Sequence, residues 1–224
     1  MAGGSKKNPV TARSGPSRGT VIGIVAVVLF AAIVGVGVYW AQRPADVVTP
    51  ANSTATGTTV GNPSASKKID VYQDFQCPVC KQFEQQSGAT IDQIVASGQA
   101  EVVYHPVAIL DRYSPDRYSS RASAASGCAA DAGVFAQYLK LLYENQPGEN
   151  QPGLTDATLI QLGEQAGGGP GFAQCVQSGK YAPWTAEVTD QASKDGIQGT
   201  PTVKVDGQEI QDPTPDAIRA AVAG

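Results

Sequence analysis

Two cysteines separated by two residues are the side chains whose type and spacing most directly indicate chemistry in this chain. Cys77 and Cys80 enclose a Pro-Val dipeptide, after an alternating, β-branched run at residues 69–75 and before a helix-like segment. A strand that ends in a C-x-x-C at the first turn of a helix is typical of a dithiol/disulfide redox site. We predict that Cys77 is the nucleophile, because a helix N-terminus stabilises a thiolate, and that Cys80 is the more buried resolving thiol.

An inert disulfide and half of a zinc site are the other uses of such a pair. Zinc needs further ligands, but Cys128 and Cys175 lie 47 residues apart and His105 is the only histidine. Haem attachment requires a histidine directly after the second cysteine, where Lys81 stands. We therefore expect a redox site with no metal and no cofactor, and a structural role for His105.

The second pair of cysteines lies in a region with helical patterns. Because the total of four cysteines is even, two disulfides can form. We expect Cys128 and Cys175 to form a structural disulfide across the helical segments, and closing a loop of that length stabilises a fold by roughly 4 kcal/mol. A second redox-active pair is the alternative, which the spacing does not decide.

The elements that must position Cys77 form a short β-α-β pattern. The strand at 69–75 leads into a helix that is expected to bury Phe83 and to end near Gly88. A further helical stretch at 90–96 precedes a strand at 101–107. The short connection predicts two parallel strands joined by a right-handed crossover.

The remainder is largely helical before it returns to strands. Helical patterns fill residues 115–182 and continue over 183–194, and a turn at 199–202 leads into a strand. Asp206-Gly207 predicts a hairpin turn, and a final helix begins at Pro215. The predicted fold class is α/β: a central β-sheet flanked by helices, with a helical insertion at about residues 110–185.

The combination of these motifs resembles a known family. Residues 74–80 read D-F-x-C-P-x-C, and Gly-Thr-Pro-Thr at 199–202 stands before a β-hairpin and a last helix. Over about residues 57–224 the chain resembles the DsbA-like thiol–disulfide oxidoreductases of the thioredoxin fold, in particular the membrane-anchored, actinobacterial type. The dipeptide between the cysteines is Pro-Val, where the best-known strongly oxidising members have Pro-His, so the resemblance leaves the redox potential open.

The resemblance implies roles for three further residues. Pro201 is expected to be cis and to pack against the cysteines, so that the backbone of Thr200 can pair with an extended substrate; an ordinary trans proline is the alternative. Asp74 occupies the family's D-F-x-C position, where a carboxylate could transfer the proton of Cys80. A strand-end acid that faces water is the alternative for Asp74.

The N-terminus indicates export. Residues 1–20 hold four basic residues and no acidic one, and Val21 to Val38 contains no charged residue before Tyr39-Trp40. About 20 apolar residues span a bilayer, and aromatic rings favour its interface. We predict a cytoplasmic basic N-terminus at 1–20 and a single-pass transmembrane anchor at 21–40, with a cleaved signal sequence as the alternative.

The segments after the anchor complete the predicted organisation. Residues 41–56 are rich in Pro, Thr, Ala and Ser and predict a flexible linker to an extracytoplasmic domain at 57–224. The whole chain has a net charge of −4 although its N-terminal segment is basic, so the rest of the chain is acidic. This charge argues against a nucleic-acid partner. An oxidising compartment would also keep disulfides formed.

These observations predict a membrane-bound oxidoreductase that introduces disulfides into exported polypeptides with free thiols. The family resemblance implies reoxidation by a quinone-linked membrane partner of the DsbB or vitamin-K-epoxide-reductase type. Two alternatives stay open: a reductase or isomerase of selected clients, and a non-catalytic thioredoxin-like binding module.

Overall fold

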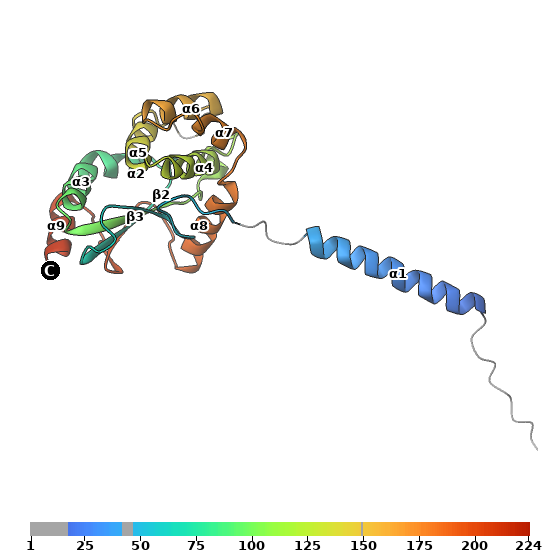
Figure 1. Ribbon diagram of the computed structural model, residues 1–224. Coiled ribbons are helices and arrows are strands. Elements are labelled where there is room, and N and C mark those ends of the chain that lie inside the picture. The colour runs from blue at the N-terminus through green and yellow to red at the C-terminus, as the bar shows by residue number, and fades with distance from the viewer. Residues whose placement is uncertain (1–17, 42–46, 149) are drawn as a thin grey trace, which may run out of the picture. The chain divides into compact units, whose positions relative to one another are not determined.

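A computed structural model describes residues 18–41, 47–148 and 150–224 of the chain. The chain divides into two units, Met1–Ala45 and Asp46–Gly224. The described part of the first unit is one helix, α1 (Arg18–Ala41), shown in blue in Figure 1. Its apolar run Val21–Val38 has a mean hydropathy of 3.0 and is long enough to cross a membrane. Residues 1–17 and 42–46, in the predicted N-terminal segment and linker, lie outside the described residues.

A five-stranded mixed sheet forms the centre of the second unit, in the order β1-β3-β2-β4-β5. The parallel pairing of β2 with β3 is confirmed, with Ile69 opposite Val102. β4 pairs antiparallel with β2, and β5 with β4. The strands are β1 (Thr58–Val60), β2 (Lys67–Gln73), β3 (Ala100–Pro106), β4 (Thr202–Val205) and β5 (Gln208–Glu209). The central strand β2 is buried from Ile69 onward, so the segment that follows it emerges from the core.

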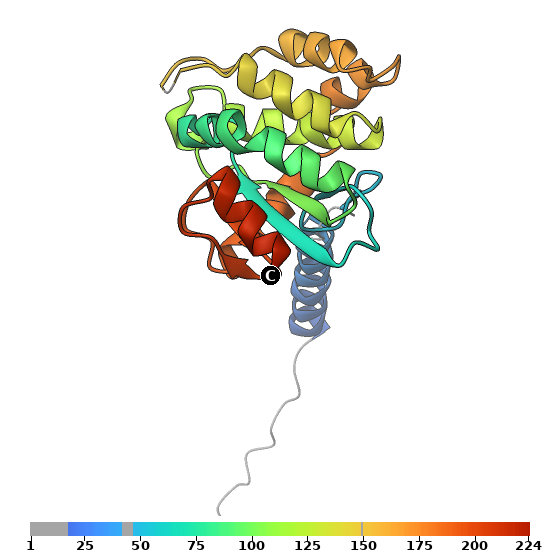
Figure 2. The same cartoon turned by 90° about the vertical axis from the view of Figure 1, so that its left-hand side faces the viewer.

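Helices cover both faces of this sheet, and a helical layer lies at one end of it. Figures 1 and 2 show α3 (Ala89–Ala96) and α9 (Pro215–Ala223) on one face and α8 (Ala182–Lys194) on the other. The insertion forms the layer at the top of both views. It consists of α4 (Tyr118–Asp131), α5 (Phe135–Glu144), α6 (Asp156–Gln165) and α7 (Phe172–Gln177), and the short 3₁₀ helix η2 (Asp111–Tyr113) precedes it.

The helix after the cysteines does not end near Gly88, so that prediction is wrong. α2 (Pro78–Phe83) passes through a π-helical turn, η1 (Glu84–Gly88), directly into α3. Gly88 keeps helical angles, φ −57° and ψ −47°. A Cβ atom at Gly88 would overlap the Glu84 carboxylate. Gly88 therefore leaves room for the Glu84 side chain and does not terminate the helix.

The predicted linker differs from the structure over residues 47–56, which belong to the folded unit. The Thr54 carbonyl accepts a hydrogen bond of 2.8 Å from Trp184 Nε1. His105 Nδ1 lies 2.5 Å from the Thr56 carbonyl, and its Nε2 lies 2.9 Å from Asp70. The His105 ring also stacks on Tyr72. The sequence could not show the contacts of Thr54 and Thr56, because their partners Trp184 and His105 lie 130 and 49 positions away in the chain.

Candidate active site

The two cysteines stand where β2 gives way to α2. Cys77 is the residue before the helix, with extended backbone angles, and Pro78 occupies the first helical position, where its missing N–H leaves no hydrogen bond unmade. Cys77 is 6% exposed and Cys80 is fully buried, and both are free thiols. Val79, between them, is 54% exposed. Cys77 is thus slightly exposed and lines an open groove, whereas Cys80 lies inside the core.

The segment before β4 meets Cys77 across the chain. In its protonated form, Cys77 donates a hydrogen bond of 3.3 Å from Sγ to the Thr200 carbonyl. The peptide bond between Thr200 and Pro201 is cis. The structure thus brings together Cys77 and Thr200, which lie 123 positions apart in sequence.

The two sulfurs have opposite electrostatic environments. A hydrogen bond from the Cys80 thiol, with others from the Thr200 side chain and from backbone N–H groups at the start of α2, lowers the pKa of Cys77 from 9.0 to about 6, against the opposing effect of burial. Burial raises the pKa of Cys80 well above its ordinary value, and the adjacent Cys77 raises it further. At neutral pH the site therefore holds a thiolate at Cys77 and a thiol at Cys80.

Asp74 is fully buried beside this pair, so the alternative of an acid that faces water is wrong. Its carboxylate accepts hydrogen bonds from Gln76 N (2.8 Å), Leu110 N (3.0 Å) and Ser119 Oγ (2.7 Å). Burial nevertheless raises the pKa of Asp74 from 3.8 to about 6, and the charge on Cys77 adds to this effect. The site thus contains a carboxyl group that changes its protonation state just below neutral pH.

Three residues of the helical insertion make contacts with the site that were not predicted. Ser119, on α4, holds the Asp74 carboxylate. Tyr143, at the end of α5, places its hydroxyl 3.4 Å from the Asp74 carbonyl, and Gln146 donates to the carbonyls of Phe75 and Cys77. No motif marks these positions, because their partners lie 45 to 71 residues away in sequence.

An open groove of about 1040 Å³ begins at Cys77. Its lining includes Val79, Leu110, Tyr113, Thr189 and Thr200. Tyr113 is 38% exposed. The groove therefore leaves open space next to Cys77.

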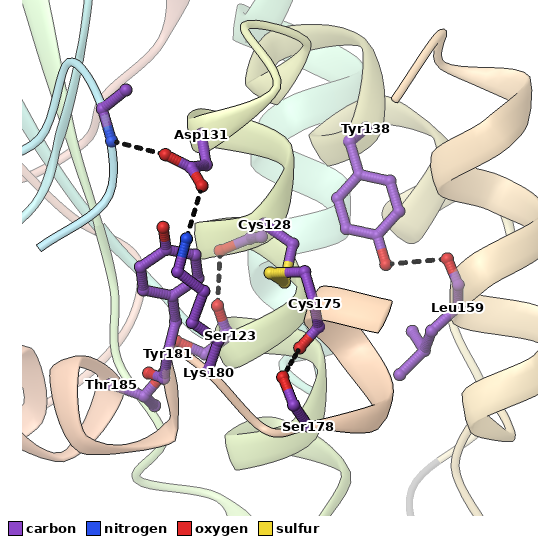
Figure 3. Close-up of a disulfide and its surroundings, with 12 residues drawn as sticks. Ser123, Cys128, Asp131, Tyr138, Leu159, Cys175, Ser178, Lys180, Tyr181 and Thr185 are labelled. Atoms are coloured by element: carbon purple, nitrogen blue, oxygen red, sulfur yellow. Dashed lines mark hydrogen bonds and ion pairs between the residues drawn. A yellow bond between two sulfur atoms is a disulfide. The ribbon is translucent and has the colours of Figure 1, made fainter. Parts of the chain in front are cut away.

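Cys128 and Cys175 form a disulfide that joins α4 to α7 (Figure 3). Their Cα atoms are 5.9 Å apart, within the usual range for disulfides. Lys180 and Asp131 make an ion pair nearby, at 2.8 Å. Neither of these two cysteines lines the groove beside Cys77, so the structure keeps the two cysteine pairs in different places.

Comparison with known proteins places the chain in a family. The family model described as Thioredoxin matches residues 53–223. Among solved structures, reduced DsbA from Mycobacterium tuberculosis is 35% identical with a TM-score of 0.64, over 73% of this chain and 85% of that chain. The reduced disulfide bond oxidoreductase DsbG of the same organism is 34% identical with a TM-score of 0.64, over 81% and 88% respectively.

The curated relatives match only a part of their own length. The serine/threonine-protein kinase PknE of Mycobacterium tuberculosis is 36% identical over 130 residues, which are 55% of this chain and 23% of the kinase. The matches to DsbA and DsbG, by contrast, cover 85% and 88% of those proteins. The chain therefore belongs to the DsbA-like thiol–disulfide oxidoreductases of the thioredoxin fold.

Proposed function

We propose that the chain is an extracytoplasmic oxidase that introduces disulfides into exported polypeptides through Cys77 and Cys80. The observation that carries the proposal is the contrast between the two sulfurs, with a lowered pKa at the accessible Cys77 and a raised pKa at the buried Cys80. Stabilising the Cys77 thiolate favours the dithiol form, which makes the disulfide form a better oxidant.

The proposed reaction begins with the disulfide form of the pair. A client thiolate attacks Cys77 Sγ, a mixed disulfide forms, and the electron pair of the broken bond goes to Cys80 Sγ, which takes up a proton. The second client thiolate then attacks the client sulfur of the mixed disulfide, and Cys77 leaves as a thiolate. The client gains one disulfide and the enzyme gains two electrons. The Thr200 backbone would align the client segment in the groove.

The reduction potential of the Cys77–Cys80 pair tests the direction of this reaction. We expect a value near the oxidising end of the known range, about −120 mV, when the protein is equilibrated with glutathione buffers. A value of about −270 mV, as in thioredoxin, would instead support a reductase. A pair that cannot be reduced or oxidised in this range would leave only a binding module.

Asp74 is the proposed proton donor to Cys80. Since its pKa is about 6, the protonated carboxyl is abundant below pH 6 and is lost as the pH rises through that value. After correction for the thiolate fraction of the client peptide, the rate of attack on the disulfide should therefore fall above pH 6. We expect Asp74→Asn to lower this rate by about 100-fold below pH 6 and to flatten the profile.

A matched control for Asp74 is Asp92→Asn, since Asp92 pairs with Lys140 on the surface. Stopped-flow oxidation of a dithiol peptide between pH 4.5 and 8 would record both variants. If Asp74→Asn keeps the wild-type profile, Asp74 has no part in proton transfer.

The cellular setting is also part of the proposal. α1 would serve as a single-pass anchor with the basic N-terminus in the cytoplasm, because its apolar run spans 18 residues and follows a basic segment. Reoxidation of Cys77 and Cys80 would come from a quinone-linked membrane protein of the DsbB or vitamin-K-epoxide-reductase type. Reoxidation of the full-length chain by membranes, with and without added quinone, is the measurement that decides this partner.

A further inference from the structure

Gln146 lies outside every predicted motif, yet it touches the backbone at Cys77. It follows Asn145, the last residue of the α5 cap, and starts the loop that leads to α6. Its Nε2 atom lies 2.9 Å from the Phe75 carbonyl and 3.0 Å from the Cys77 carbonyl. Carbonyl oxygens only accept hydrogen bonds, so chemistry fixes the orientation of the amide: both N–H groups of Gln146 point at the redox site.

These two bonds hold the turn that connects β2 to α2. The turn residue Asp74 has its carbonyl 3.4 Å from the hydroxyl of Tyr143, which stands three residues before Gln146. Tyr143, in α5, and Gln146, just after it, therefore contact three carbonyls of the turn, at Asp74, Phe75 and Cys77. The helical insertion, through this short segment, fixes the path of the backbone that carries the nucleophile.

The Phe75–Gln76 peptide extends the contact to the carboxylate. Its carbonyl accepts from Gln146, and its N–H group, that of Gln76, donates to Asp74 Oδ1 at 2.8 Å. A peptide that accepts a hydrogen bond at its oxygen becomes a stronger donor at its nitrogen. Gln146 is thus connected through one peptide group to the acid beside the two sulfurs.

We infer that Gln146 is a positioning residue of the redox site, which orients the Cys77 backbone and strengthens the hydrogen bond that stabilises ionised Asp74. The inference rests on the proposed function, in which Cys77 is attacked and Asp74 supplies a proton. It assigns the helical insertion a role in positioning the redox site. Loss of the amide would loosen the Cys77 peptide and raise the pKa of Asp74, because a weaker donor stabilises the carboxylate less.

The test compares Gln146→Met with a neighbour that does not reach the site. Methionine has a similar length and no N–H group, so it removes both donors and keeps most of the volume. We expect the rate of oxidation of a dithiol peptide to fall about tenfold, because the two hydrogen bonds to the Phe75 and Cys77 carbonyls are lost. The descending limb of the pH profile should also move to higher pH, which a merely structural role would not produce.

Asn145→Leu is the matched control. Asn145 lies in the same segment and is exposed, and its Nδ2 atom donates only to the Leu141 carbonyl at 2.9 Å. We expect it to keep the wild-type rate and pH profile. The thermal unfolding midpoint of each variant would be measured alongside, so that a loss of folding is separated from a loss of positioning.

Two outcomes would overturn the inference. In the first, Gln146→Met folds and its rate and profile equal those of the wild type. The second variant, Gln146→Asn, decides the case if the methionine variant does not fold. Its side chain is shorter, so its amide no longer reaches both carbonyls. A wild-type rate and pH profile for Gln146→Asn would then contradict the inference. A wild-type chain that oxidises no peptide would refute the proposed function instead, and the pH dependence of Cys77 alkylation would then still report on Gln146.

Discussion

Cys77→Ala is expected to lose thiol–disulfide exchange completely, down to the rate of the peptide in buffer alone. Cys77 supplies the accessible sulfur, whereas Cys80 is fully buried and burial raises the pKa of its thiol, so Cys80 cannot replace it. The substitution removes one sulfur atom from a residue at the helix start and should leave the fold intact. Oxidation of a dithiol peptide, with the unfolding midpoint as the check on folding, measures the effect.

Cys80→Ala is the partner variant for this experiment. It keeps the Cys77 thiol but removes the sulfur that would release a bound client, so mixed disulfides with clients should accumulate. Isolation of these adducts from cells would identify the clients, and the proposal requires that they carry export signals. Full client function in a Cys77→Ala strain would contradict the oxidase proposal and support a binding module.

The largest expected effect on stability comes from the second cysteine pair. Replacing both Cys128 and Cys175 by alanine opens a loop that the disulfide closes across a sequence separation of 47 residues. On the chain-entropy model, the free energy of unfolding should fall by about 4 kcal/mol. Denaturant-induced unfolding of the soluble domain measures this change. We expect the peptide oxidation rate at a temperature where the variant is folded to stay at the wild-type level.

The wild-type protein under strong reducing conditions is the control for this variant. If the disulfide stabilises only through its cross-link, the reduced wild type and the double alanine variant should unfold at the same denaturant concentration. A loss of peptide oxidation in the folded double variant would instead show that Cys128 and Cys175 form a second redox-active pair. That alternative is the one that the sequence spacing left open.

Local patterns predicted most of the elements around the site. Pro78 at the first helical position and the alternating residues before Cys77 act over a few residues, so the strand, the turn and the start of α2 could be predicted from the sequence. Thr155 and Thr214 accept hydrogen bonds from the first turns of α6 and α9, which is also a short-range signal.

The contacts that define the chemistry depend on distant residues and could not be predicted. The burial of Asp74 requires Ser119 and Leu110, and the position of the Cys77 carbonyl requires Gln146. Gly88 was wrongly predicted to end a helix, because propensity alone does not show that the Glu84 side chain occupies the space beside it. Long-range contacts thus place Asp74 and Cys77, whereas the error at Gly88 comes from a side chain only four positions away.

The segment at 47–56 has a consequence for solubility. An unpaired edge strand can pair with another chain and nucleate aggregation. Here Ser53 forms a bridge with Thr58, and Thr59 N donates to the Asn52 carbonyl at 2.8 Å, so the segment covers the outer edge of β1. The opposite edge, β5, is only two residues long and carries Glu209. Both edges of the sheet therefore offer little unpaired backbone to a stray strand.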